Sequence, residues 1–341
     1  MLNMPRKKGG VVRRLILGSI AAAMLLGGSP AQAQMEKTSI ALPAIAVVFL
    51  SSYVAEDAGI WKKDGLDVEV KFVAGVGAFN AVVAGSADFS MSSGLTINRA
   101  AAHGQRMLAI ANTLNRLPMQ VVIRSDLAGA FDPKAPLAER AKILKGRTMA
   151  VDSVNSVVHA YLRVIAKAGG IDPDSIQVAP LQPVDMLAAM DRKAIDGFSN
   201  GPPWPEKVLS EGKAVLIASG VKGDPPGIDP LAFNVVVTRP QFCKDHASIC
   251  MKMGRSMVDA AKFIHDHPDD VLAFLKKRFP DITAAATKAA FEQVAAATPL
   301  DPAVVEKGLA NADKLNLDAG LMKPDDKVQS YDGLYTAEFV K

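Results

Sequence analysis

The fold is indicated by residues 148–201, which read TMAVDSVNSVVHAYLRVIAKAGGIDPDSIQVAPLQPVDMLAAMDRKAIDGFSNG. Short apolar runs alternate there with longer segments that have glycine or proline at their ends. Glycine favours the position after a helix and proline the first helical turn, so these residues mark helix boundaries. Strands that alternate with helices form parallel sheets of crossover units. The predicted strands are Thr148–Val151, Ile176–Val178 and Ala194–Ser199, and the predicted helices run from Asp152–Ser156 to Ala168-Gly169-Gly170 and from Pro183 to Met190.

The same order of elements is predicted about a hundred residues earlier. Gly65–Val70 alternates apolar and charged residues, which is typical of a half-buried strand. Ala87–Ser90 matches Ala194–Ser199 in the second copy. Two copies of one α/β plan predict two lobes, and roughly 300 residues exceed one ordinary core. The predicted strands are Ile40–Leu42, Ile45–Leu50, Gly65–Val70 and Ala87–Ser90, and the predicted helices run from Ser51-Ser52 to Ala58-Gly59, from Gly75–Gly77 to Gly85 and from Ser92–Gly94 to His103.

Two further predicted strands, Met119–Arg124 and Phe233–Thr238, have no place in this alternation. They bracket the second copy, so we expect them to carry the chain into the second lobe and back. After Thr238 the pattern predicts helices only, which should pack on the first lobe. The expected division is lobe 1 over residues 36–120 and 233–341, and lobe 2 over residues 121–232. The predicted C-terminal helices are Ile249–His265, Pro268–Phe279, Thr283–Ala297 and Pro302–Leu315.

Residues 1–33 have the three parts of a secretory signal peptide. A basic stretch precedes the apolar run Leu15–Leu26 and the small-residue cleavage site Ala31-Gln32-Ala33. The apolar run is shorter than the roughly 20 residues of a membrane-spanning helix. We expect cleavage after Ala33 and export to the periplasm, by the general route or, given Arg13-Arg14, by the twin-arginine route. The basic residues are Arg6, Lys7, Lys8, Arg13 and Arg14.

The net charge of +4 belongs to this N-terminal segment. Without its five basic residues, 39 Lys and Arg become 34, against 35 Asp and Glu. A nucleic-acid-binding face needs a clustered surplus of Lys and Arg, so that class is disfavoured. Nucleophile-elbow, phosphate-loop and zinc-protease motifs do not occur, and His265-Asp266-His267 is interpreted as a solvated turn before Pro268. We expect no enzyme activity, no cofactor and no metal site.

Cys243 and Cys250 are the two cysteines of the chain. In an oxidising compartment they predict a disulfide, and the alternative is two buried thiols. Seven positions along one regular helix separate α-carbons by about 10 Å, which is too far for the bond. A bond therefore requires Cys243 to precede the helix that contains Cys250, with Asp245 as the expected cap of that helix.

Polar and glycine-rich segments stand at the predicted carboxyl ends of strands, where open α/β sheets bind ligands. Each precedes a helix, whose free N–H groups suit an anionic group, although the same residues also cap helices without a ligand. Carboxylates are scarce among them, with Asp152 and Asp185 the exceptions. Trp204 is either an apolar wall for the ligand or a packing residue. The candidate ligand-binding residues are Ser51, Ser52, Tyr53, Gly75, Val76, Gly77, Ser92, Ser93, Ser153, Asn155, Ser156, Asn200, Pro203 and Trp204.

Several segments, together with the export signal, resemble the nitrate/sulfonate/bicarbonate-type (NMT1/THI5-like) solute-binding proteins of ABC transporters. The resemblance covers most of the mature chain. The segments are the Tyr53–Gly59 helix followed by Gly65-Leu66-Asp67-Val68, the Gly85–Asp88 turn, Leu144-Lys145-Gly146 before a strand, Ala168-Gly169 to Asp172-Pro173, and Pro202–Trp204.

The resemblance implies a two-lobed periplasmic-binding-protein type II fold, with two mixed α/β sheets joined by two hinge strands. It implies a monomer that closes on a small organic anion, a sulfonate or carboxylate, and delivers it to ABC permease subunits in the membrane. The family's serine cluster matches Ser51-Ser52, and its Ser-Pro-Gly-Ser-type loop matches Ser153–Ser156, with Val154-Asn155 replacing Pro-Gly. Its Trp-x-Pro-type segment matches Asn200–Trp204. The alternatives are a pyrimidine-precursor enzyme or binder of the THI5 type and a ligand-sensing partner of a membrane receptor.

Overall fold

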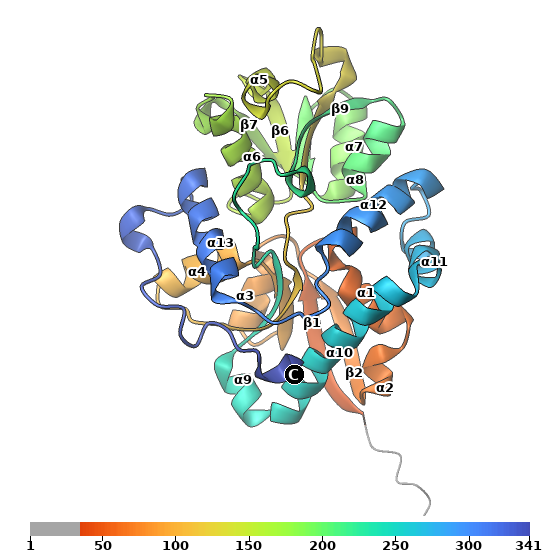
Figure 1. The fold of residues 1–341 in the computed structure, drawn as a ribbon, viewed down its shortest axis with the longest axis vertical. Helices are drawn as coiled ribbons and strands as arrows, with labels where there is room; N and C mark the ends of the chain where they lie inside the picture. Colours follow the sequence, from red (N-terminus) through yellow and green to blue (C-terminus); the bar gives the residue numbers. More distant parts are fainter. Residues whose placement is uncertain (1–34) are drawn as a thin grey trace, which may run out of the picture. The chain divides into compact units, whose positions relative to one another are not determined.

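The computed structural model describes residues 35–341, which form one compact unit. The predicted signal peptide and its cleavage site lie outside the described residues. Two sheets flanked by helices occupy opposite ends of this unit (Figure 1). The predicted α/β class with two mixed sheets is confirmed. We call the sheet nearer the N-terminus, with its helices, lobe 1, and the other sheet, with its helices, lobe 2.

The sheet of lobe 1 has the strand order β2-β1-β3-β10-β4. Strand β1 runs parallel to β2 and β3, whereas β10 runs antiparallel to β3 and β4. The interior strand β1 is buried over its last five residues, while the edge strand β2 alternates in burial, as the alternation of its sequence predicts. The strands are β1 (Glu36–Leu42), β2 (Leu66–Phe72), β3 (Phe89–Ser92), β4 (Leu108–Leu114) and β10 (Asn234–Thr238).

The sheet of lobe 2 repeats this plan with the order β7-β6-β8-β5-β9. Strand β6 is parallel to β7 and β8, and β5 is antiparallel to β8 and β9. In each sheet, therefore, one strand that arrives from the other lobe is inserted antiparallel beside the parallel strands. The strands are β5 (Gln120–Arg124), β6 (Thr148–Val151), β7 (Gln177–Pro180), β8 (Gly197–Asn200) and β9 (Ala214–Ser219).

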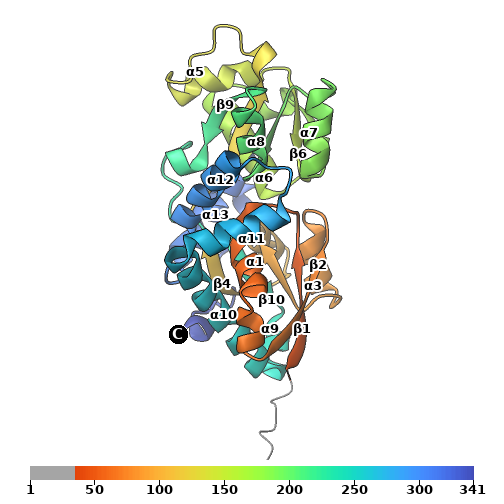
Figure 2. The ribbon, with the colours of Figure 1, turned by 90° about the vertical axis from the view of Figure 1, so that its right-hand side faces the viewer.

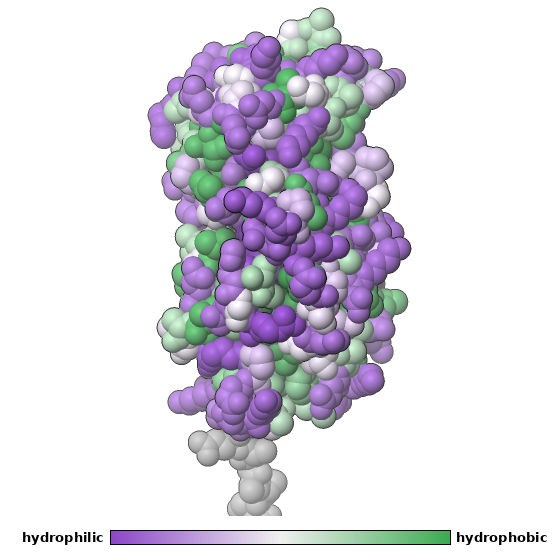
Figure 3. All heavy atoms as spheres, turned by 90° about the vertical axis from the view of Figure 1, so that its left-hand side faces the viewer, coloured by the Kyte–Doolittle hydropathy of each residue, from purple (hydrophilic) through white to green (hydrophobic). Residues whose placement is uncertain are grey.

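Helices cover both faces of the sheets (Figure 2). Within residues 35–341 none of them is long and apolar enough to cross a membrane. On the face in Figure 3, hydrophilic and hydrophobic residues mix in small patches. The helices are α1 (Leu50–Asp57), α2 (Ile60–Lys63), α3 (Gly77–Val83), α4 (Gly94–Ala102), α5 (Leu137–Ala141), α6 (Val157–Ala168), α7 (Pro183–Asp191), α8 (Trp204–Ser210), α9 (Pro240–Asp245), α10 (Ala247–Asp266), α11 (Pro268–Arg278), α12 (Ala284–Ala297) and α13 (Glu306–Ala319).

The chain passes between the lobes twice, over residues 115–119 and 220–233. The strands β5 and β10 that follow these passages are full members of the sheets they enter. The C-terminal helices also differ from expectation, because they do not pack on lobe 1 alone. Helix α12 contacts α8 of lobe 2, and α13 contacts α6 of lobe 2 as well as α4 of lobe 1.

The strand predicted over Ile45–Leu50 is wrong. After Pro43 the chain bends, forms a 3-10 turn over Val47–Phe49 and enters α1 at Leu50. A short continuous apolar run fits a buried strand and a buried helix equally well, and here all of Val47–Leu50 is buried in helical turns. Ser51 and Ser52 consequently lie inside α1 rather than in a loop before it.

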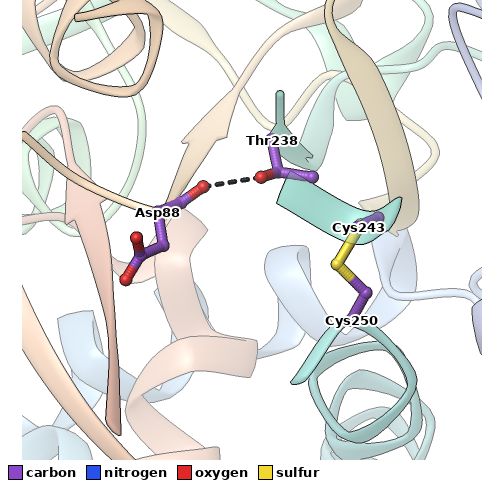
Figure 4. Close-up of a disulfide and its surroundings, with 4 residues drawn as sticks. All are labelled: Asp88, Thr238, Cys243 and Cys250. Atoms are coloured by element: carbon purple, nitrogen blue, oxygen red, sulfur yellow. Dashed lines mark hydrogen bonds between the residues drawn. A yellow bond between two sulfur atoms is a disulfide. The ribbon is translucent and has the colours of Figure 1, made fainter. Parts of the chain in front are cut away.

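Cys243 and Cys250 form a disulfide, with their Cα atoms 5.6 Å apart (Figure 4). Cys243 lies in α9 and Cys250 in the first turn of α10, so the bond joins two separate helices. Nearby, the Thr238 hydroxyl donates to the Asp88 carbonyl oxygen at 2.7 Å. Asp245 was expected to cap α10, but it does not. His246 is the N-cap residue instead, and its side chain makes no capping hydrogen bond. Its non-helical backbone separates α9 from α10.

Candidate functional site

A cavity of about 70 Å³ lies between the lobes, at the carboxyl ends of the parallel strands. One water needs about 10–15 Å³ by the same measure, so the cavity admits a small molecule of several non-hydrogen atoms. Its walls come from both lobes and both interlobe passages. The lining residues are Pro43, Ala44, Ala46, Val48, Phe49, Gly75, Val76, Phe79, Met91, Ser92, Ser93, Thr96, Met119, Asp152, Ser156, Val157, Val158, Asn200, Phe233 and Asn234.

The topology explains why these residues converge. Parallel strands that carry helices at their carboxyl ends bring the intervening loops to one edge of each sheet. In lobe 1 the loops follow β1, β2 and β3, and in lobe 2 they follow β6 and β8. Because the two edges face one another, residues more than a hundred positions apart line one space.

The polar part of the wall contains two helix caps. The Ser93 hydroxyl accepts from the Thr96 N–H at 3.2 Å and caps α4, and the Ser156 hydroxyl accepts from the His159 N–H at 3.2 Å and caps α6. Ser93 Oγ also lies 3.1 Å from Thr96 Oγ1. The capped N–H groups are thereby satisfied within each helix, while the hydroxyls of Ser92, Ser93 and Thr96 line the cavity beside one another.

The two amides of the wall are held by the protein. Asn234 Nδ2 donates to the Val48 carbonyl oxygen at 2.7 Å. Asn200 Oδ1 accepts from the Gly201 N–H at 2.7 Å, and its Nδ2 lies 3.4 Å from Met186 Sδ. These bonds fix both side chains before a ligand arrives, which lowers the entropy cost of binding.

Asp152 is the titratable side chain of the wall, and no Lys or Arg accompanies it among the described lining residues. It follows β6, and its Oδ1 accepts from the Ser153 N–H at 2.7 Å and from the Ser156 hydroxyl at 2.5 Å. Burial raises the pKa of Asp152, and the hydrogen bonds from the Ser156 hydroxyl and from the backbone of Ser153 and Asp152 oppose the rise.

The remaining wall is apolar. Phe49, Phe79 and Phe233 supply ring surface, and methionine and valine side chains fill the gaps between them. A mostly apolar cavity with a few fixed polar groups is the usual form of a small-molecule site.

The lobes contact each other around the cavity. The Val47 N–H donates to the Pro202 carbonyl oxygen at 2.9 Å, and Trp204 Nε1 donates to the Ile45 carbonyl oxygen at 3.0 Å. On the other side, a Cβ atom added to Gly75 would lie 2.3 Å from Ser153 Oγ. The loops of the two lobes thus touch at both rims of the cavity.

Arg99 of α4 reaches across to the loop that follows β6. Its guanidinium donates to the Asn155 carbonyl oxygen and, at 2.9 Å, to Asn316 Oδ1 of α13. Burial lowers the pKa of Arg99 to about 10. The Asn155 N–H donates to His159 Nδ1 at 3.0 Å, and burial together with nearby arginines lowers the pKa of His159 to about 4, so this ring is a neutral acceptor at pH 7.

The structure brings part of the sequence-predicted set to the cavity. Other members lie beside it: Asn155 and Ser153 hold interlobe contacts, Gly77 begins α3, and Pro203 precedes α8. The predicted residues that line the cavity are Gly75, Val76, Ser92, Ser93, Ser156 and Asn200, and those that do not are Ser51, Ser52, Tyr53, Gly77, Ser153, Asn155, Pro203 and Trp204.

Three of the residues outside the cavity are packing residues. Ser51 and Ser52 are buried in α1. The Tyr53 hydroxyl accepts from the Ala46 N–H at 3.3 Å, and burial raises its pKa to about 12. Of the two interpretations of Trp204, the structure supports packing, because its ring lies edge-on to Phe279, with centroids 5.9 Å apart, and outside the cavity.

Sequence reasoning missed the apolar wall, Thr96 and Asn234. Phe49, Phe79 and Phe233 have no distinguishing signal, since each looks like an ordinary core residue. Asn234 could have been found, because it is a polar residue at the start of the apolar return strand, where the chain re-enters lobe 1.

Comparison with known proteins supports the architecture. A family model described as NMT1/THI5 like matches residues 47–271. The chain is 26% identical over 170 residues to the taurine-binding periplasmic protein of Escherichia coli (strain K12). The aligned region covers 49% of this chain and 51% of that protein. The match thus spans about half the length of that relative.

Solved structures share the fold. A protein from Bordetella bronchiseptica RB50 superposes with a TM-score of 0.76 at 20% identity, covering 90% of this chain and 96% of that one. The alkanesulfonate-binding protein SsuA from Xanthomonas axonopodis pv. citri, bound to MOPS, superposes with a TM-score of 0.66 at 16% identity, covering 85% and 95%. The family model spans well over half of the sequence, so the resemblance inferred from the sequence is confirmed: the chain belongs to the NMT1/THI5-like family.

Proposed function

We propose that this protein is the solute-binding component of an ABC import system and binds a small organic anion, a sulfonate or a carboxylate, between its lobes. The observation that carries the proposal is the cavity itself, which both lobes line and whose rims are closed by interlobe contacts. Hinged closure on a solute explains why one site needs residues from two lobes. The names of the relatives support the class of ligand.

The cavity offers an anion hydroxyl donors from Ser92, Ser93 and Thr96 at the start of α4. Hydroxyl groups donate to sulfonate or carboxylate oxygens without the desolvation cost of a buried charge. The apolar wall suits the carbon body of such a ligand. A micromolar affinity requires about −8 kcal/mol, which a few such bonds and a buried apolar body can supply.

The cavity wall supports binding without turnover. Of its hydroxyls, that of Ser156 donates to Asp152 and caps α6, and the His159 ring accepts from a backbone N–H instead of activating a serine. Incubation of the purified protein with sulfonates, carboxylates and pyrimidines, followed by mass spectrometry, tests this point. Recovery of unchanged solute supports a binding protein, and conversion of any of them supports the enzyme alternative.

The same proposal places the mature protein in the periplasm as a monomer that delivers its solute to membrane permease subunits. Intact-mass measurement of exported material should give a chain that begins near Gln34. Retention of Met1 together with sedimentation in membranes would contradict export of the cleaved form.

A thermal-shift screen over sulfonates, carboxylates and neutral heterocycles tests the ligand class. Ligand at a hundred times its dissociation constant should stabilise the protein by about 2.7 kcal/mol. A shift with sulfonates or carboxylates supports the proposal. If only neutral heterocycles raise the melting temperature, the anion assignment is wrong.

A further inference from the structure

A groove of about 600 Å³ lies between α12 and lobe 2, and it shares no lining residue with the cavity described above. Helices α8 and α12 lie side by side and form two of its walls (Figure 2). Its apolar surface comes from Leu209 and Leu216 of lobe 2 and from alanine side chains of α12. The proposed function makes no use of this groove.

The floor of the groove carries two oxygen atoms without a hydrogen-bond partner in the described part of the chain. They are Gln120 Oε1 and Glu206 Oε2, on residues that are only 4% and 6% exposed. The other atoms of the two groups fix their orientation. Gln120 Nε2 donates to Glu206 Oε1 at 2.9 Å, and Gln293 Nε2 of α12 donates to the same oxygen. One carboxylate oxygen therefore accepts both amides while the other stays free.

The protein supplies no cation for Glu206 within residues 35–341. The groups that lower its pKa are the two amides and its own backbone, and the adjacent Lys207 pairs with Glu211 at 2.9 Å. Lys222 and Glu292 also line the groove, but both are exposed. Buried carboxylates in proteins are normally paired, so this one points to a partner from outside the chain.

We propose that the groove is a second binding site, which takes a primary ammonium group on a short apolar chain. Both free oxygens are acceptors, and an ammonium group has three N–H donors. A positively charged donor also bonds a carboxylate more strongly than a neutral one does. The apolar chain of such a ligand lies against Leu209, Leu216 and the alanines of α12.

Amide NMR titrations of the purified protein without solute test the proposal. The side-chain amides of Gln120 and Gln293 report on the groove directly, because both donate to Glu206. The probe is n-butylammonium chloride. At equal ionic strength it is compared with tetramethylammonium chloride, which has the charge but no N–H donor, and with 1-butanol, which has the alkyl chain but no charge. The n-butylammonium ion should shift both amide signals and bind about ten- to a hundredfold more tightly than either comparison, as is typical of a charge-assisted hydrogen bond.

Glu206→Gln should lower the affinity for n-butylammonium at least tenfold, because the charge is lost and an N–H donor takes the place of Oε2. Glu292→Gln is the matched control. Glu292 is an exposed carboxylate of the same groove, so its loss should change the affinity by less than about fivefold. Ala289→Leu fills the groove from α12 and leaves Glu206 in place, so it should abolish binding independently of any effect of Glu206→Gln on folding.

A pH series provides a further readout. Burial raises the pKa of Glu206 to about 7, so lowering the pH from 8 to 6 should weaken n-butylammonium binding by removing the charge. Lys222 and Glu292, the other charged residues that line the groove, remain in Glu206→Gln. The pH dependence should therefore vanish in that variant.

Three results would overturn the proposal. They are equal affinity for n-butylammonium and tetramethylammonium, full binding by Glu206→Gln, and an unmodified protein whose Gln120 and Gln293 amide signals do not respond to n-butylammonium. None of them bears on the proposed solute binding, which depends on the other cavity.

Discussion

At the scale of single residues, Gly75 decides how closely the lobes approach. Its φ of +55° lies in the left-handed region, and a Cβ atom there would lie 2.3 Å from Ser153 Oγ of the other lobe. Gly129 has nearly the same φ, +54°, with no atom within 4 Å of the corresponding Cβ position. Both glycines therefore adopt a left-handed backbone conformation, but of the two Gly75 alone lies against a residue of the other lobe.

Gly75→Ala and Gly129→Ala should each lower the free energy of unfolding by about 1–2 kcal/mol, the cost of a left-handed L-residue. Only Gly75→Ala should weaken solute binding, by about tenfold or more, because the closed form becomes less populated. Urea unfolding and calorimetry measure the two effects. Equal affinity in both variants would show that Gly75 and Ser153 do not limit closure.

Glu206 of α8 is buried at a second contact between the lobes. Gln120 Nε2 donates to Glu206 Oε1 and to Gln293 Oε1 of α12, both at 2.9 Å, and Gln293 Nε2 also donates to Glu206. Burial raises the pKa of Glu206 from 4.5 to about 7, although these amides lower it.

The raised pKa of Glu206 predicts a pH dependence of stability. Between pH 4.5 and pH 7 the folded protein holds a proton that the unfolded chain has released. The free energy of unfolding should therefore fall by up to about 3 kcal/mol as the pH rises through this window. Glu206→Gln removes the titration, so the difference between the two urea-unfolding profiles from pH 4 to pH 8 isolates it. A difference that does not change with pH would contradict the assignment.

How many of the cavity residues could be predicted from the sequence depends on where each residue stands and on what it packs against. Ser92, Ser93, Ser156 and Asn200 could be placed at the cavity because they stand at the carboxyl ends of strands, where the topology brings the loops of both lobes together, although Ser93 and Ser156 also cap helices. Ser52 was misplaced because the apolar run before it forms helical turns instead of a strand, which puts Ser52 inside α1. Trp204 could not be judged, because it packs against Phe279 at the end of α11, which is distant in the sequence.

At the scale of elements, the disulfide joins α9 to α10 and closes a loop of seven residues' separation. Chain-entropy estimates give such a short loop a stabilisation of roughly 2–3 kcal/mol. Cys243→Ser combined with Cys250→Ser should lower the free energy of unfolding by that amount. Dithiothreitol should destabilise the unmodified protein similarly and leave the double variant unchanged. An unmodified protein that is insensitive to reduction under unfolding conditions would contradict the prediction.

Most elements could be predicted because glycine and proline mark their ends. Helix α6 ends at Ala168, before Gly169-Gly170, and α7 begins at Pro183, as the sequence indicates. Strands β4 and β9, which take equivalent edge positions in the two sheets, were missed because neither belongs to the repeated run of strand and helix that the sequence displays. Each is recognised only through pairing with β10 or β5, which reach the sheet from the other lobe.

At the scale of the whole molecule, the two tryptophans report on different regions. Trp204 packs at the interlobe contact against Ile45 and Phe279, whereas Trp61 is buried in lobe 1. Opening of the lobes should break the Trp204 bond to Ile45 and admit water to Trp204, while Trp61 should stay buried within lobe 1. Solute binding should therefore shift the emission of Trp204 to shorter wavelengths.

Trp61→Phe should retain this shift and Trp204→Phe should lose it, as fluorescence titration of the two variants can measure. A shift that persists in Trp204→Phe would mean that the lobes do not separate at this contact.

The strand order of lobe 1 has a consequence for how the chain is made. Strand β10 lies between β3 and β4, yet it is synthesised about 120 residues after β4. All five strands of lobe 2 lie between Gln120 and Ser219, so that lobe has its complete sheet while β3 and β4 still lack the strand that joins them. A polypeptide that stops short of Asn234 therefore carries one lobe with a complete sheet and another with two unpaired strand edges, the feature that favours aggregation and degradation. Because synthesis proceeds from the N-terminus, β10 is the last strand to join the sheet of lobe 1. Chains that end before β10 differ from complete chains by these unpaired strand edges.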